Sequence, residues 1–376
     1  MRKATTTNYR ITAEAITPVH IGSGRELQHN TDYLYFQGSR QVAVIDPNKA
    51  LHIIGAENID AWVTAINQRR GLDEYITKIL KKPMEPADIS SRLMRVDARG
   101  LNKQNIKEQL HNGSGVPYIP GSSIKGALRT AILTTLIEQS PDFTGKLNNL
   151  QKEVRRRGEK SYDFDDGKLM ANYFGNDPNQ DFLRFLRVGD AHFSNTSCHL
   201  IITENLTNKG WQVKEQINQY VECISYGQSA TFSLSIFDIG DQGKNYIHKN
   251  IDTLLTGSFF SMVNEYTLRW INNEIAFWDN EGDGQTEKEY LKVLINLEKI
   301  ASSLPPDTCL IRVGFGGGFS SMTGDWQSDY MTADDYGELV YSLRNPRYEG
   351  LLFPKTRKFT QDSLQLGFIK FTAQKV

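Results

Sequence analysis

The sequence is poor in cysteine and has no long apolar run, and these absences exclude several classes of protein. Its three cysteines form no CxxC pair, so neither a disulfide framework nor a zinc-finger spacing is available. No stretch approaches the roughly 18 apolar residues that a membrane span needs. The first residues also lack the apolar core of an export signal. We therefore expect a cytoplasmic protein that is not embedded in a membrane.

The chain also lacks an excess of charge of either sign. Its 376 residues carry 43 Lys and Arg against 44 Asp and Glu, a formal net charge of -1. A nucleic-acid-binding surface needs cations to neutralise phosphates. Cations nevertheless cluster at residues 152–160 and 355–358. These clusters permit local basic surfaces on a neutral protein, although short charge runs are also common on solvated faces.

Apolar patterns in the first 140 residues alternate between strand and helix. Residues 9–16 alternate apolar and polar side chains and predict a strand, and two runs joined at Gly38 predict a hairpin. Helical spacing over residues 48–80 puts four apolar residues on one face, namely Ile59, Trp62, Val63 and Ile66. The pattern weakens over residues 81–117, where we expect a long insertion loop.

The second half of the chain predicts the same mixture of elements. A basic, polar segment spans residues 141–185, and strand-like runs return at Leu186 and recur to the end. The chain is 39% hydrophobic and 23% charged, which is typical of folded domains and, at this length, of two of them. We predict an α+β fold with an N-terminal domain at residues 1–140, a basic insertion, and a C-terminal domain at 186–376.

The most specific motif, PGSSIKGALR at residues 120–129, precedes a predicted helix. Free amide groups and the helix dipole favour an anion at such a helix start, and a serine is available as the N-cap. The residues that could bind a phosphate there are Gly121, Ser122, Ser123, Lys125 and Arg129. A plain capped helix with two solvated cations is the alternative. An ATPase loop is excluded because GxxxxGK[ST] is absent.

A second motif, RVGFGGGFSS at residues 312–321, is dense in glycine. Glycines permit positive φ and an open nest of amides, while phenylalanines can stack on bases. We predict a single-stranded RNA contact by Arg312, Gly314, Phe315, Gly316, Gly317, Gly318 and Phe319. The alternative is a flexible turn with core phenylalanines. A dinucleotide fold is disfavoured because Phe319 replaces the last glycine of GxGxxG.

A third segment, FPKTRKF at residues 353–359, interleaves cations with aromatic residues. Lys355, Arg357 and Lys358 could follow a phosphate backbone, or they could form an ordinary solvated face.

No pairing of residues predicts catalysis. His20, in the loop HIGSG at residues 20–24, could be a general base, could contact RNA or could be structural. Asp32 could cut RNA with a metal, could orient a 2′-hydroxyl, or could be an ordinary turn residue before a strand. We expect no metal site and no cofactor.

Three islands, TPVHIGSG, YIPGSSIKGALRTA and RVGFGGGFSSMTG, together resemble the RAMP superfamily of CRISPR-associated proteins. Their order and spacing are most similar to the family of the fifth subunit of the type III-A Csm effector complex. The resemblance implies two ferredoxin-like, RRM-related domains with helical and loop insertions. It also implies that His20, the residues 121–129 motif and the glycine motif bind crRNA.

The same resemblance implies a role in antiviral defence. The chain would cap the 3′ end of the guide RNA, assist crRNA maturation, and contact other Csm subunits, above all the filament-forming RAMP subunit, and host nucleases. An alternative within the superfamily is a metal-independent endoribonuclease that processes CRISPR repeat RNA with His20 as acid or base. A relative cuts target RNA with an Asp near the place of Asp32, but no matching loop is visible here.

Overall fold

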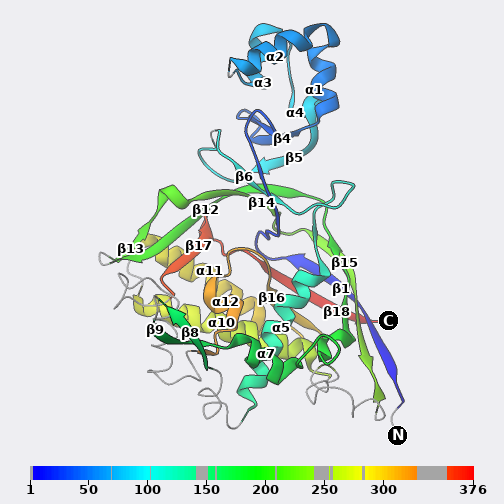
Figure 1. The fold of residues 1–376 in the computed structure, drawn as a ribbon, viewed down its shortest axis with the longest axis vertical. Helices are drawn as coiled ribbons and strands as arrows, with labels where there is room; N and C mark the ends of the chain where they lie inside the picture. The colour runs from blue at the N-terminus through cyan, green and yellow to red at the C-terminus, as the bar shows by residue number, and fades with distance from the viewer. Residues whose placement is uncertain are drawn as a thin grey trace.

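The computed structural model describes residues 3–376 except 69, 102, 141–150, 157–158, 208–209, 241–253, 255–256, 282–283 and 328–353. Its strands form two main curved sheets with helices packed on them, and a helical lobe projects from one end (Figure 1). The α+β prediction is confirmed. In the described part of the chain, no helix is long and apolar enough to cross a membrane.

The first sheet has five strands, all antiparallel. In spatial order they are β10 (Leu186–Val188), β15 (Ser229–Asp238), β1 (Thr5–Ala15), β18 (Phe368–Lys375) and β16 (Thr308–Arg312). The helices of this half are α5 (Gly121–Glu138), α10 (Phe259–Glu281) and α11 (Gln285–Ser302). One apolar core joins the sheet to α5 and α10, with Ile11, Ile132, Val263 and Phe371 inside it. The strand predicted at residues 9–16 corresponds to β1, which is the middle strand of this sheet.

The second sheet has nine strands and crosses the middle of the molecule (Figure 1). Its path runs β2 (Gly22–Leu27), β6 (Ile106–Gln109), β14 (Gln219–Ile224), β12 (Thr196–Thr207), β5 (Ser90–Val96), β4 (Gln41–Ile45) and β3 (Tyr33–Phe36). Two further strands pair with β12, namely β13 (Gly210–Val213) and β17 (Thr356–Thr360). The predicted hairpin around Gly38 is β3 and β4.

The insertion at residues 81–117 is not the long loop that its weak pattern predicted. It contains β5 and β6, and both are internal strands of the nine-stranded sheet. The burial of β5 does alternate, with Met94 and Val96 inside. The charged Arg92 hides this alternation in the sequence, because its charge is compensated by carboxylates on other strands.

The helical lobe breaks the predicted helix of residues 48–80 into pieces. These are α1 (Pro47–Ile54), α2 (Ile59–Asn67), α3 (Leu72–Glu74) and a π-helix (Tyr75–Ile79), with α4 (Pro86–Ile89) closing the lobe. Gly55, at a φ of 86°, ends α1. Of the apolar stripe predicted on α2, only Trp62 packs on the core of the lobe. Ile59, Val63 and Ile66 are 40–49% exposed.

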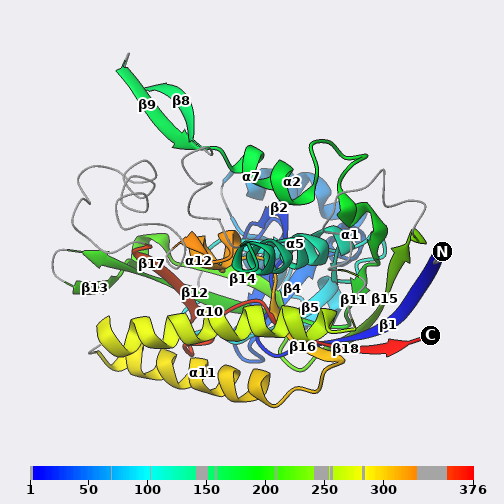
Figure 2. The ribbon, with the colours of Figure 1, turned by 90° about the horizontal axis from the view of Figure 1, so that it is seen from below.

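Shorter elements connect the sheets. They are β7 (Tyr118–Ile119), β8 (Gln151–Arg156), β9 (Glu159–Phe164), α7 (Asp166–Phe174), a 3₁₀ turn (Phe182–Phe185), β11 (Ala191–His192) and α12 (Gly318–Thr323). The β8–β9 hairpin of the basic insertion projects away from the body (Figure 2). Both main sheets contain strands from before residue 140 and from after residue 186. The two halves of the chain therefore share both sheets.

Candidate functional site

The start of α5 is held by an acidic side chain from another element. The backbone N–H of Gly121 donates to Asp190 Oδ1 at 2.7 Å, and a Cβ on Gly121 would lie 2.1 Å from the Val188 carbonyl oxygen. The predicted serine N-cap is wrong, because Pro120 occupies that position without a side-chain bond. The protein's own carboxylate thus uses part of the anion-attracting capacity of the helix start.

The two cations of the first motif differ in their surroundings. Arg129 forms an ion pair with Asp181, and its guanidinium lies 4.5 Å from the centre of the Phe174 ring. The ammonium of Lys125 has no ion pair within the described ranges. Burial lowers the pKa of Lys125, and Asp181 opposes this shift. Lys125 and the exposed Ser122 are therefore the groups of this motif most available to a phosphate, and their binding of one stays a prediction.

The HIGSG loop and the glycine-rich loop touch each other directly. The N–H of Phe315 donates to the His20 carbonyl at 2.9 Å, and the two rings meet edge to face at 5.7 Å. Gly314 has a φ of 78°, and a Cβ there would lie 2.3 Å from the His20 carbonyl oxygen. Only glycine allows this approach. Two of the three sequence islands are thus one surface.

The imidazole of His20 is buried and has a defined tautomer. The residue is 2% exposed, and Nδ1 lies 2.7 Å from the Glu222 carbonyl oxygen. Because a carbonyl only accepts, Nδ1 carries the proton. Burial lowers the pKa of His20. Burial therefore favours the neutral form of the side chain and shields it from solvent, an arrangement that supports the loop and disfavours direct RNA contact or acid–base chemistry.

Arg312 holds the shape of the glycine-rich loop from behind. Its guanidinium donates to the carbonyl oxygens of Leu366, Gly316 and Gly317, at 2.9, 3.0 and 3.5 Å. It also lies 4.8 Å from the ring centre of Trp270. Direct RNA contact by Arg312 stays a prediction, and this engagement with the loop disfavours it. The glycines at 314, 316 and 318 all have positive φ, and such alternating backbones form anion-binding nests.

The third segment packs next to this loop, and its cations are also unequal. Arg357 forms a two-bond ion pair with Glu274 at 2.8 and 2.9 Å, and it is buried. A phosphate contact by Arg357 would have to break this buried pair, which is costly. The ammonium of Lys358 instead lies 4.5 Å from the ring centre of Phe315. Burial and the charge of Lys107 lower the pKa of Lys358.

A cleft of about 580 Å³ joins the second and third motifs. Its walls are the backbone of the glycine-rich loop, the segment from Pro354 to Lys358, and aromatic and apolar side chains. The residues that line it outside the second and third motifs are Trp270, Glu274, Tyr290 and Met322. The sequence shows the two motifs as separate segments, and in the structure both line one cleft. Lys355 and Phe319 also line it.

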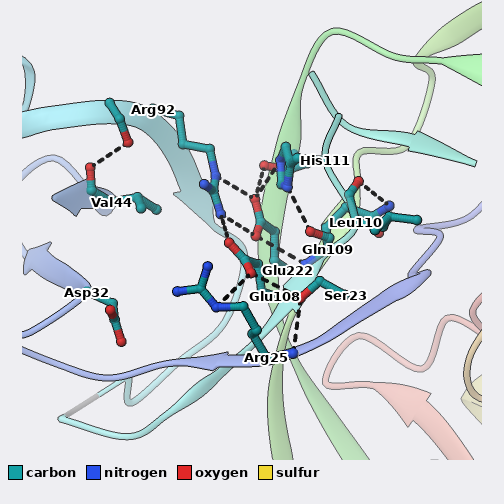
Figure 3. A network of polar contacts seen from close by, with 12 residues as sticks. Ser23, Arg25, Asp32, Val44, Arg92, Glu108, Gln109, Leu110, His111 and Glu222 are labelled. Carbon is teal, nitrogen blue, oxygen red and sulfur yellow. Dashed lines mark hydrogen bonds and ion pairs between the residues drawn. The ribbon is translucent and has the colours of Figure 1, made fainter. Parts of the chain in front are cut away.

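A buried network of charged side chains contacts the HIGSG loop through Glu108 and Glu222 (Figure 3). Glu222 is fully buried, and its carboxylate accepts from Arg92 at 3.1 and 3.3 Å. Arg92 also pairs with Glu108 at 3.0 Å. Burial alone would raise the pKa of Glu108, but hydrogen bonds from Arg92 and Ser23 outweigh it and lower that pKa. This network is not predictable from a sequence pattern, because its members come from four separate strands, β2, β5, β6 and β14.

Asp32 lies apart from this network. Its Oδ2 accepts from the backbone N–H of Gln28 at 2.8 Å, and Figure 3 shows its side chain without a link to the other residues drawn. This is the contact of a turn residue. Among the described residues, no group of three His, Cys, Asp or Glu side chains could hold a metal ion.

Comparison with known proteins gives a consistent result. The model of the RAMP superfamily matches residues 12–321. The chain is 28% identical over 335 residues to the CRISPR system Cms protein Csm5 of Methanocaldococcus jannaschii, covering 83% of this chain and 72% of that protein. A protein of the same name from Enterococcus italicus is 24% identical over 148 residues, which are 33% of this chain and 42% of that protein.

Solved structures show the same fold at low sequence identity. A chain in a cryo-EM structure of a Csm–crRNA–target RNA ternary complex of a type III-A CRISPR-Cas system has a TM-score of 0.71 and 17% identity, covering 97% of this chain and 100% of that one. A crystal structure of T. onnurineus Csm5 has a TM-score of 0.66 and 17% identity, covering 95% and 99%.

Proposed function

This chain belongs to the RAMP superfamily, and from that premise we propose that it is a crRNA-binding subunit of a type III-A Csm effector complex. The observation that carries the proposal is the junction of the HIGSG loop with the glycine-rich loop, through the bond from Phe315 N–H to the His20 carbonyl. The junction borders a cleft with lysines on its wall. Backbone amides, lysines and aromatic rings are the groups that bind single-stranded RNA.

The first motif belongs to the same proposed surface. The α5 helix contacts the end of α12, just after the glycine motif, through Thr134, whose hydroxyl donates to the Gly324 carbonyl at 3.2 Å. Lys125 and Ser122 would contact RNA phosphates at its other end. Of the sixteen RNA contacts predicted from sequence, we retain as direct contacts the backbone and aromatic groups of the glycine-rich loop together with Ser122, Lys125, Lys355 and Lys358. We assign His20, Arg129, Arg312 and Arg357 to the support of that surface.

The finer role follows from the similarity to Csm5 proteins. We propose that the chain caps the 3′ end of the guide RNA, contacts the filament-forming RAMP subunit, and assists crRNA maturation by positioning host nucleases. The element order β1, α5, β10, β15, α10, β18 is the β-α-β-β-α-β order of a ferredoxin-like module. We infer that the five-stranded sheet is one such module, assembled from both halves of the chain.

Two assays with purified protein test the proposal. A crRNA ending in a free 3′ guide segment should bind in a gel-shift assay, and an unrelated duplex DNA should bind more weakly. Repeat RNA incubated with the protein in EDTA should stay intact, because His20 is buried and its Nδ1 is engaged. A cleaved repeat would favour the endoribonuclease alternative. Failure to bind any RNA would contradict the proposal.

A further inference from the structure

Two lysines from distant segments converge on one aromatic ring. The ammonium of Lys107, on β6, lies 5.7 Å from the ring centre of Phe315, and that of Lys358, on β17, lies 4.5 Å from it. Sequence reasoning singled out Phe315 and Lys358 but not Lys107, which stands in the segment expected to be a loop. Lys107 and Lys358 belong to the nine-stranded sheet, and Phe315 belongs to the glycine-rich loop. Their contact therefore joins the sheet to the loop beside the cleft.

Neither lysine has an ion pair within the described ranges of the chain. The cross-strand neighbour of Lys107 is Glu26, whose carboxylate accepts instead from Asn105 Nδ2 at 3.1 Å. The next residue along β6, Glu108, pairs with Arg92. Beside Lys358, Arg357 engages Glu274. Glu26, Glu108 and Glu274 therefore have other partners. None of them compensates the charge of the two ammonium groups.

The electrostatic potential near the ammonium groups of Lys107 and Lys358 favours the binding of an anion. Burial lowers the pKa of Lys358, and the charge of Lys107 lowers it further. The same lysine charge also helps to lower the pKa of His20, after the larger effect of burial. Half-buried like charges that repel each other are stabilised by a bound anion. The contact of each lysine with the Phe315 ring does not remove this repulsion, because a ring is only a weak partner for a cation.

We propose that Lys107 and Lys358, which both lie against the Phe315 ring, bind the phosphate backbone of an RNA strand. This proposal rests on the proposed function. It adds Lys107 as an RNA-binding residue and gives a position for the phosphate backbone of the RNA. Lys358 and Phe315 also line the cleft beside the glycine-rich loop. A strand held by the two lysines would therefore pass the mouth of that cleft, with its bases next to Phe319 and Met322.

The salt dependence of RNA binding tests the proposal. For a single strand, each phosphate contact contributes about 0.7 to the slope of log K against log salt concentration. We expect the Lys107→Ala, Lys358→Ala double variant to lose about 0.7 if the lysines share one phosphate, and about 1.4 if each binds its own. The matched control is Lys292→Ala, on α11, where the lysine pairs with Glu289. Its slope should equal that of the unsubstituted protein.

The outcomes separate this inference from the proposed function. An unchanged slope in the double variant, with RNA still bound, would overturn the lysine site and leave the RNA-binding proposal standing. Absence of RNA binding by the unsubstituted protein would overturn both. Competition by inorganic phosphate or AMP at concentrations similar to those of RNA would show a site for a free anion instead and would also overturn it. Lys→Gln variants repeat the test if the alanine variants unfold.

Discussion

The N–H of Phe315 donates to the carbonyl oxygen of His20 at 2.9 Å, and this bond joins two loops from opposite ends of the chain. Gly314 makes the approach possible, because its positive φ and missing side chain leave room for the His20 carbonyl. The proposed RNA surface depends on this junction.

Gly314→Ala should disrupt the junction. The new Cβ would lie 2.3 Å from the His20 carbonyl oxygen at a φ of 78°. Gly318→Ala is the matched control, since its φ is 71° and nothing lies within 4 Å of its Cβ. We expect the control to cost about 1 kcal/mol of unfolding free energy and Gly314→Ala about 1–3 kcal/mol more, with weaker RNA binding. Equal losses in urea denaturation would contradict the proposed packing.

Glu222→Ala should destabilise the fold strongly. The substitution removes the fully buried carboxylate that pairs with Arg92, and breaking such a buried pair costs about 3–5 kcal/mol. Arg92 keeps its bond to Glu108, so we expect the lower end of that range. Lys78→Ala, which removes an exposed pair with Glu74, should change the unfolding free energy by less than about 0.5 kcal/mol. Similar losses for both variants would contradict the structural role of the network.

Lys125→Ala and Arg129→Ala should have different effects. Lys125 has no ion pair in the described chain, so its removal should weaken RNA binding, lower the salt slope by about 0.7 and leave thermal stability unchanged. Arg129→Ala also removes the partner of Asp181 and the contact with Phe174, so it should lower the melting temperature. Unchanged RNA affinity of a folded Lys125→Ala variant would argue against phosphate binding by this motif.

Glu204→Gln should change how stability depends on pH. Glu204 is 4% exposed, and burial together with Glu287 raises its pKa from 4.5 to about 7. The folded state therefore favours the protonated acid, so this contribution to stability is present below pH 4.5 and is lost as the pH rises through about 7. Above pH 7 the variant should be the more stable protein, by at most about 3 kcal/mol.

Urea denaturation at pH 5 and pH 8 measures this effect. The difference between Glu204→Gln and the unsubstituted protein should be larger at pH 8. Glu215→Gln, at an exposed position, should show no such trend. A Glu204→Gln difference independent of pH would contradict the raised pKa.

The sequence predicts the local elements well and their partners poorly. The central strand, the hairpin around Gly38 and α5 follow from periodicity and turn residues, because these signals are local. The internal strands β5 and β6 were missed because Arg92 and Glu108 interrupt their apolar patterns, and only the folded sheet shows that the two side chains compensate each other.

The candidate site shows the same limit. The sequence identifies the motifs that carry cations, but it cannot show that Arg129 and Arg357 have the buried or half-buried partners Asp181 and Glu274. These pairs join residues 52 and 83 positions apart. Lys107 lies in none of the three motifs. It is identified as a candidate only because the fold brings its ammonium near the Phe315 ring.

Purification of the tagged chain from its native host tests the central claim most directly. Sequencing of the bound RNA and identification of the co-purifying proteins are the readouts. The account predicts short guide RNAs with a repeat-derived 5′ tag, together with a set of Csm subunits. Recovery of the chain alone and free of RNA would contradict it.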